Sequence, residues 1–124
     1  MKFFIALLLL LNSALGFCQE AEFFFPETEY KFPKTDEGEL LKHDFVFKNV
    51  GTEPLFITNI KVNCMCTKYR FPLKPVMPGA QDTIHVSFDT QGKAGYQIRD
   101  LEIFANTPKN PTKIRFKVQV KKAK

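Results

Sequence analysis

The sequence predicts an all-β domain of about seven antiparallel strands, preceded by a cleaved leader. Hydrophobic periodicity after residue 18 is two almost everywhere and nowhere 3.6, which is typical of half-buried strands and not of amphipathic helices. All eight prolines lie after residue 18. Charged residues make up 25% and hydrophobic residues 44% of the chain, a balance that excludes disordered, collagen-like and coiled-coil classes.

The first 18 residues are interpreted as a signal peptide. Lys2 precedes an apolar run from Phe3 to Leu11, and the small residues Ala14 and Gly16 follow. The run is shorter than the roughly 20 apolar residues that a spanning helix needs, and no later run is longer. We therefore expect an exported product, periplasmic or extracellular, whose mature chain has no transmembrane segment.

The cleavage point decides the role of Cys18. Cleavage after Gly16 and cleavage after Cys18 both place small residues at the required positions, and we prefer the second, which leaves Gln19 first. Lipoprotein anchoring at Cys18 is not expected, because Phe17 stands where that signal needs a small residue. Residues 19–124 then form a single domain, since their number suits one core and leaves no room for a second.

The alternating runs give the strands in chain order. They are Phe23 to Phe25, Tyr30 to Phe32, Leu41 to Phe47, Leu55 to Val62, Ile84 to Phe88, Ile98 to Ala105 and Ile114 to Val120. The alternation changes phase in the runs that start at Leu55 and Ile98, which predicts a bulge in each. We expect these side chains to face the core: Phe45, Phe47, Ile57, Val86, Phe88, Ile103 and Phe116.

Turn residues separate the strands at intervals typical of antiparallel sheets. They lie at Asn49 to Pro54, Pro72 to Gly79, Gly92 to Gly95 and Asn106 to Pro111. About seven strands with this spacing favour an immunoglobulin-like sandwich. A parallel α/β fold is excluded, because the crossover helices that it needs are missing.

Several short motifs in a fixed order carry a family resemblance. The order is Phe45-Val46-Phe47-Lys48-Asn49-Val50-Gly51, Pro54-Leu55-Phe56-Ile57, Asn63-Cys64-Met65-Cys66-Thr67, Pro78-Gly79, Ile84 to Asp89 and Ala105-Asn106-Thr107. The mature chain resembles a secreted bacterial family of unknown function, domain number fifteen seventy-three, related to sperm-protein and cilia-associated immunoglobulin-like domains. The resemblance implies architecture and export, and it implies no activity. The family usually has glycine where this chain has Met65.

Cys64 and Cys66 are the only cysteines of the mature chain, and three interpretations compete. In an oxidising compartment the pair forms a structural disulfide, provided that the strand bends locally. It is alternatively a redox-active pair, with Lys68 and Arg70 favouring the thiolates. As a third alternative, Cys64, Met65 and Cys66 are soft ligands that suit Cu(I), although Met65 points away from both cysteines in a regular strand. We prefer the disulfide and expect no metal or cofactor.

His85, Ser87 and Asp89 share one face of a predicted strand without forming a catalytic triad. The histidine of a triad stands between the serine and the acid, whereas Ser87 is the central residue here. His43 and His85 are interpreted as solvent-side strand residues, and they lack the paired spacing of zinc ligands. We expect no catalytic residue and no enzymatic activity.

A row of cations lies along the last predicted strand. Lys113, Arg115, Lys117 and Lys121 project from one side and are a candidate surface for an anionic partner. Lysines on an edge strand also prevent edge-to-edge pairing, and we favour that interpretation. No aromatic residue shares the face of the cations, because Phe116 is expected to face the core, so nucleic-acid binding is not expected.

The leading hypothesis is an exported, non-enzymatic binding or scaffolding module that contacts another envelope or secreted protein through an edge strand or its end loops. The alternative is a thiol–disulfide or Cu(I)-handling protein that acts through Cys64-Met65-Cys66. The sequence identifies neither the partner nor the oligomeric state.

Overall fold

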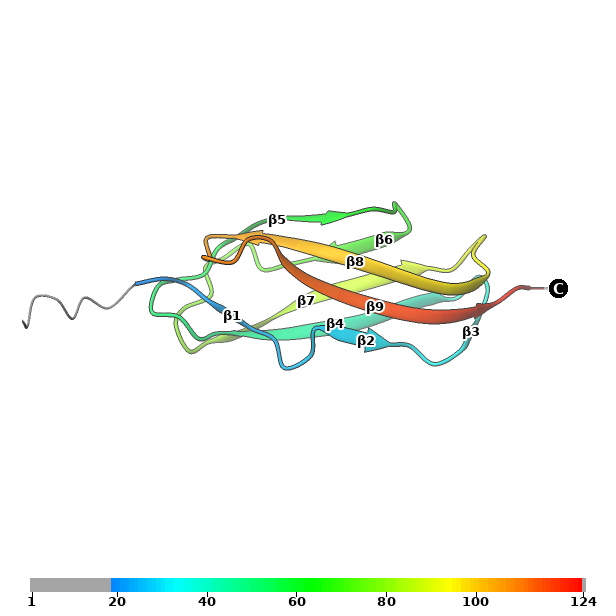
Figure 1. Ribbon diagram of the computed structural model, residues 1–124, viewed down its shortest axis with the longest axis horizontal. Coiled ribbons are helices and arrows are strands. Elements are labelled where there is room, and N and C mark those ends of the chain that lie inside the picture. Colours follow the sequence, from blue (N-terminus) through cyan, green and yellow to red (C-terminus); the bar gives the residue numbers. More distant parts are fainter. Residues whose placement is uncertain (1–18, 124) are drawn as a thin grey trace, which may run out of the picture.

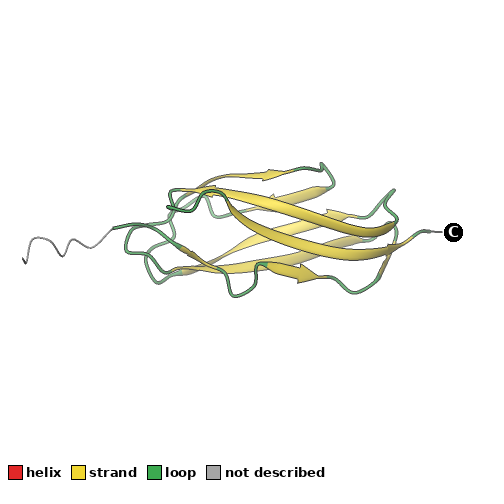
Figure 2. Cartoon of the chain, in the orientation of Figure 1, coloured by secondary structure: helices red, strands yellow, loops and turns green. Residues whose placement is uncertain are grey.

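The computed structural model describes residues 19–123, which form nine strands and no helix. The predicted signal peptide and Cys18 lie outside the described residues. Two sheets face each other across one core (Figures 1 and 2). The strands are β1 (Phe23–Phe24), β2 (Glu29–Lys31), β3 (Thr35–Asp36), β4 (Leu40–Asn49), β5 (Ile57–Val62), β6 (Thr67–Arg70), β7 (Gln81–Asp89), β8 (Gly95–Ala105) and β9 (Thr112–Lys121).

The two sheets are of different kinds. Sheet A has the order β1-β4-β7-β6 and is antiparallel throughout. Sheet B has the order β2-β9-β8-β5, with β3 also paired to β9, and both β2 and β3 run parallel to β9. The prediction of an all-β sandwich is confirmed, but the chain has more strands than expected and two of them are not antiparallel.

The core lies between the sheets and is built from alternate residues of each long strand. Phe45 and Phe47 of β4, Phe88 of β7 and Phe116 of β9 are fully buried, and the Phe88 and Phe116 ring centroids lie 5.1 Å apart. The predicted core residues are buried except Ile57, which is half-buried against the core. Burying such large apolar surfaces is the main stabilising term of the fold.

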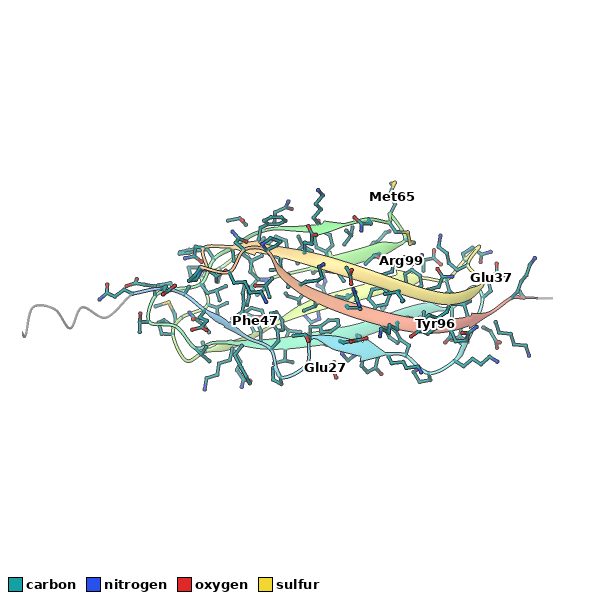
Figure 3. The ribbon with its side chains drawn as sticks, in the orientation of Figure 1. Glu27, Glu37, Phe47, Met65, Tyr96 and Arg99 are labelled. Atoms are coloured by element: carbon teal, nitrogen blue, oxygen red, sulfur yellow. A yellow bond between two sulfur atoms is a disulfide. The ribbon has the colours of Figure 1, made fainter. Side chains whose placement is uncertain are left out.

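One of the two predicted bulges is present. In β5 the register against β8 shifts between Ile57 and Asn59, as the phase change predicted. The bulge predicted in β8 was wrong, because β8 pairs with β9 without a shift. The apparent phase change has another cause: Ile98 lies on the outer face of β8, and Arg99, labelled in Figure 3, takes the inward position. The Arg99 Cζ atom lies 5.3 Å from the centroid of the Phe88 ring.

Polar side chains tie together the loops at the ends of the sandwich. Asn49 is fully buried, donates to the carbonyl oxygens of Glu53 (2.8 Å) and Val76 (2.9 Å), and accepts from the backbone N–H of Gly51 (2.9 Å). Asn106, in the loop after β8, donates to the carbonyl oxygen of Pro54, in the loop before β5, over 2.9 Å. The two asparagines of the motifs that carry the family resemblance therefore act as structural ties between loops.

The edges of the sheets differ from the expected arrangement. β9 lies inside sheet B, between β8 and the short strands β2 and β3, so its cations do not guard an edge. The described edges are instead β5 in sheet B and β6 in sheet A, together with the short N-terminal strands on the other side. β5 and β6 both lie at the upper side in Figure 1, joined by the turn that contains Cys64 and Cys66.

Candidate functional site

The cysteine motif forms a disulfide within a tight turn. Cys64 and Cys66 are bonded to each other, with Cα atoms 5.2 Å apart. The backbone N–H of Thr67 donates to the Cys64 carbonyl oxygen (3.1 Å), which gives the bend that such closely spaced cysteines need. Met65 is 94% exposed and projects from the tip of the turn (Figure 3).

The ligands of the proposed copper site do not converge. The two cysteine sulfurs are used by the disulfide, and the Met65 side chain points into solvent. Residues 19–123 hold no cluster of three or more His, Cys, Asp or Glu side chains that could bind a metal. The structure gives no support to the copper or redox alternative.

His43 lies on the core side of sheet A, so its placement on the solvent side was wrong. Its ring stacks on Tyr30 of β2, with centroids 3.6 Å apart, and its Nε2 lies 2.6 Å from Glu27 Oε1. His43 shares its face of β4 with Phe45, and an imidazole is apolar enough on its faces to pack there while its edge meets a carboxylate.

His85 is exposed on the outer face of sheet A, as expected. Its Nδ1 lies 2.7 Å from Asp44 Oδ1 on β4, the neighbouring strand. Asp89 instead accepts a hydrogen bond from the Gln91 backbone (2.9 Å), and no hydrogen bond joins Ser87 to His85 within the described part of the chain. These residues form an acid–histidine pair and no triad.

Two of the four cations predicted on β9 are paired with carboxylates on the outer face of sheet B. Arg115 Nε lies 2.6 Å from Asp100 Oδ1 on β8, and Lys117 pairs with Glu29 on β2. The Asp100 hydrogen bond raises the pKa of Arg115, and the same bond lowers the pKa of Asp100. Hydrogen bonding to Glu29 likewise raises the pKa of Lys117. Lys113 and Lys121, at the ends of β9, have no ion pair within residues 19–123.

The outer face of sheet A carries a second group of cations that the sequence did not reveal. Cross-strand register places Lys42, Ser87 and Lys68 in one row across β4, β7 and β6. Asp44, His85 and Arg70 form the adjacent row, and together the six side chains line a hollow of about 390 Å³. We call these six residues the sheet A cluster.

Lys42, Lys68 and Arg70 have no ion pair among residues 19–123. The one carboxylate of the sheet A cluster, Asp44, is paired with His85. In the sequence, β4, β7 and β6 each show two polar residues at positions i and i+2, which indicates that both side chains of a pair lie on the same face of their strand. Only the pairing of the strands brings the three pairs together.

A second hollow, of about 470 Å³, continues from the sheet A cluster past the end of β6. Tyr69, Arg70 and His85 line both hollows. The second alone is lined by the apolar Phe71, Pro72 and Leu73 and, on its β7 side, by Asp82 and Thr83. Leu73 is 90% exposed. A cationic surface therefore adjoins an apolar one on the same side of the molecule, a combination that favours contact with another protein more than with a small ion.

The model of a family described as "Protein of unknown function (DUF1573)" matches residues 23–120. The chain belongs to this family. The resemblance found in the sequence motifs is thus confirmed over nearly all of the described domain. No curated protein matches the chain.

Solved structures share the fold at low sequence identity. A Porphyromonas gingivalis W83 protein of unknown function is 20% identical, with a TM-score of 0.72 over 86% of this chain and 50% of that one. This chain thus spans half the length of that protein. The ASH / PapD-like domain 7 of human CEP192 is 11% identical, with a TM-score of 0.65 over 89% of this chain and 92% of that one.

A third similar structure is WR4, a C. elegans MSP family member, which is 9% identical, with a TM-score of 0.50 over 83% of this chain and 99% of that one. These likenesses show that the chain shares its fold with an ASH / PapD-like domain and with a sperm-protein family member, in agreement with the resemblance that the sequence motifs carry. Among the described residues, no helix is long and apolar enough to cross a membrane.

Proposed function

We propose that this chain is an exported, non-enzymatic module that binds another envelope or secreted protein through the outer face of sheet A. The observation that carries this proposal is the contrast between the two outer faces. On sheet B, the central cations Arg115 and Lys117 are matched by carboxylates, and the unmatched Lys113 and Lys121 lie apart at the two ends of β9. On sheet A, Lys42, Lys68 and Arg70 lie together in adjacent rows and are all unmatched within the described chain. Unmatched charge beside exposed apolar side chains suits a surface that meets a partner.

The shape of the surface supports binding more than catalysis. The hollow over the sheet A cluster is bounded by three strands of one flat face, so it does not enclose a substrate or exclude water as an active site does. Export is supported by the apolar leader, and an exported setting agrees with the Cys64–Cys66 disulfide.

Site-specific photo-crosslinking in the producing cells tests the proposal. A photoreactive amino acid at Ser87, inside the sheet A cluster, should give a discrete protein adduct. The same amino acid at Gln119, on the outer face of sheet B, should give none, because we place no partner there. Adducts of equal yield from both positions, or none from Ser87, would contradict the proposed face. Cell fractionation of the same samples should find the processed chain among the exported proteins.

A further inference from the structure

The free edge of sheet A lies beside the sheet A cluster. β6 is the last strand of the order β1-β4-β7-β6, and no other described strand pairs with its outer edge. A strand in this position leaves backbone N–H and C=O groups free, which is the arrangement that lets a strand of another chain join the sheet. The edge is short, so a joining strand would pair over few residues and its side chains would decide the affinity.

Alternate side chains of β6 have different chemistry. Lys68 and Arg70 are exposed on the outer face, while Tyr69 between them is half-buried and packs against the core. The Tyr69 ring stacks on Phe71, with centroids 6.2 Å apart and planes at 22°. A strand added beside β6 would therefore meet cations on one face and aromatic rings on the other.

Pairing of β6 with the β6 of a second copy is unfavourable. Two such strands would place Lys68 and Arg70 of one copy beside the same cations of the other, and like charges on neighbouring strands repel. The neighbouring edge strand, β5, is interrupted by its bulge and carries the exposed Lys61. The charges at this side of the sandwich therefore disfavour a second copy and favour an acidic strand.

We propose that β6 accepts an extended segment of a partner protein in which acidic and apolar residues alternate. The carboxylates lie opposite Lys68 and Arg70, with Lys42 adding to the positive field across β7. The apolar side chains between them cover Tyr69 and Phe71. This proposal rests on the proposed function and specifies its partner by charge and by conformation.

The alternation of acidic and apolar residues distinguishes this partner from a general polyanion. A phosphate-rich polymer would be attracted by the three cations alone and would gain nothing from the free backbone groups of β6 or from its aromatic side. A strand uses all three features, since its main chain, its outward carboxylates and its inward apolar groups each have a counterpart at this edge. The exposed Leu73 extends the apolar side beyond the end of β6.

The test uses the purified protein and a labelled peptide of alternating glutamate and valine, with binding followed by fluorescence anisotropy and by NMR shifts. We expect saturable binding with the shifts concentrated in β6 and β7. The double change Lys68→Glu and Arg70→Glu should weaken binding at least tenfold. Lys113→Glu with Lys121→Glu, which alters the net charge by the same amount on sheet B, should change it less than twofold. Denaturant melts check that both variants are folded.

Two further peptides distinguish strand pairing from simple charge attraction. N-methylation at successive residues keeps the charge but prevents strand pairing, so it should weaken binding at least tenfold. A peptide of equal composition with its glutamates in one block should also bind at least tenfold more weakly. The proposal is overturned if either peptide, or inositol hexakisphosphate as a polyanion, binds as tightly as the alternating peptide. It is also overturned if the sheet B variant loses as much affinity as the β6 variant. If no peptide binds while Ser87 still gives a discrete adduct, the acidic-strand inference fails and the proposed function stands.

Discussion

Single residues explain both what the sequence reveals and what it conceals. The family motifs depend on Asn49, Gly51 and Asn106, whose contacts tie one loop to another. Gly51 is required because a Cβ there would lie 2.1 Å from the Glu20 carbonyl oxygen. Such residues identify the fold and say little about function, which is why the resemblance predicted architecture without an activity.

Asn49→Ala tests the role of that tie. The change leaves the Glu53 carbonyl oxygen and the backbone N–H groups of Glu22 and Gly51 without their partner, and an unpaired buried group costs about 1–3 kcal/mol. The Val76 carbonyl oxygen keeps its hydrogen bond from the Leu55 backbone N–H. We expect a loss of about 2–4 kcal/mol in the free energy of unfolding, measured by denaturant melts. Asn59→Ala, at an exposed position of β5, should stay within about 0.5 kcal/mol. Similar losses in both variants would refute the tie.

Two residues show where alternation misleads. His43 and Arg99 are polar by composition, yet both take inward positions on their strands. His43 does so by stacking on Tyr30, and Arg99 by extending over Phe88 while its guanidinium donates to the Ile98 carbonyl oxygen and to Gln97 Oε1. Tyr30 and Phe88 belong to other strands, and the hydrogen bonds of Arg99 are made by the polar end of its side chain. A hydrophobic pattern along one strand records neither kind of contact.

At the scale of elements, the long strands were predictable, and so were the short aromatic strands β1 and β2, whereas β3 and β6 were not. The runs that became β4, β7 and β9 bury alternate residues over nine or ten positions, so their pattern is unambiguous. β6 has one inward aromatic residue among four, and β3 has two residues in all, too few to show any period. The pairing of β2 and β3 with β9 is long-range, and so the sequence wrongly suggested that β9 was an edge.

The disulfide lies within the turn between β5 and β6 and adds little to the stability of the fold. The loop between Cys64 and Cys66 is very short, so closing it removes little entropy from the unfolded chain, about 1.5 kcal/mol by the loop formula. We expect the double change to serine to lower the free energy of unfolding by at most about 2 kcal/mol in denaturant melts, and to leave the adduct at Ser87 intact. Wild-type protein melted with a reductant should match the variant. Loss of the adduct would show that the turn serves binding.

The Asp100–Arg115 pair between β8 and β9 should make stability depend on pH. Because Arg115 lowers the pKa of Asp100 in the folded state, the stabilisation is present above the unfolded pKa of about 3.9 and is lost as pH falls through the folded pKa. The stability difference between wild type and Asp100→Asn should therefore shrink over that acidic range, followed by denaturant melts at each pH. Asp82→Asn, at an exposed carboxylate without an ion pair in the described domain, provides the baseline. A difference that stays constant with pH would contradict the pairing.

At the scale of the whole molecule, the fold begins before the region that the family model covers. The match starts at residue 23, but Ala21 is already 99% buried, with only 1% of its surface exposed. The backbone N–H groups of Val50 and Thr52 donate to the carbonyl oxygens of Glu22 (2.9 Å) and Glu20 (2.8 Å). The segment that follows the expected cleavage point is therefore part of the sandwich.

A chain that begins at Phe23 should for this reason be less stable than one that begins at Gln19. It loses the burial of Ala21, two backbone hydrogen bonds and the contact of Glu22 N–H with Asn49 Oδ1, so we expect a loss of about 2–4 kcal/mol in denaturant melts. Glu20→Ala keeps the backbone contacts and should stay within about 0.5 kcal/mol of the chain that begins at Gln19. If both chains melted alike, residues 19–22 would be a linker, and the cleavage point could vary without cost to the fold.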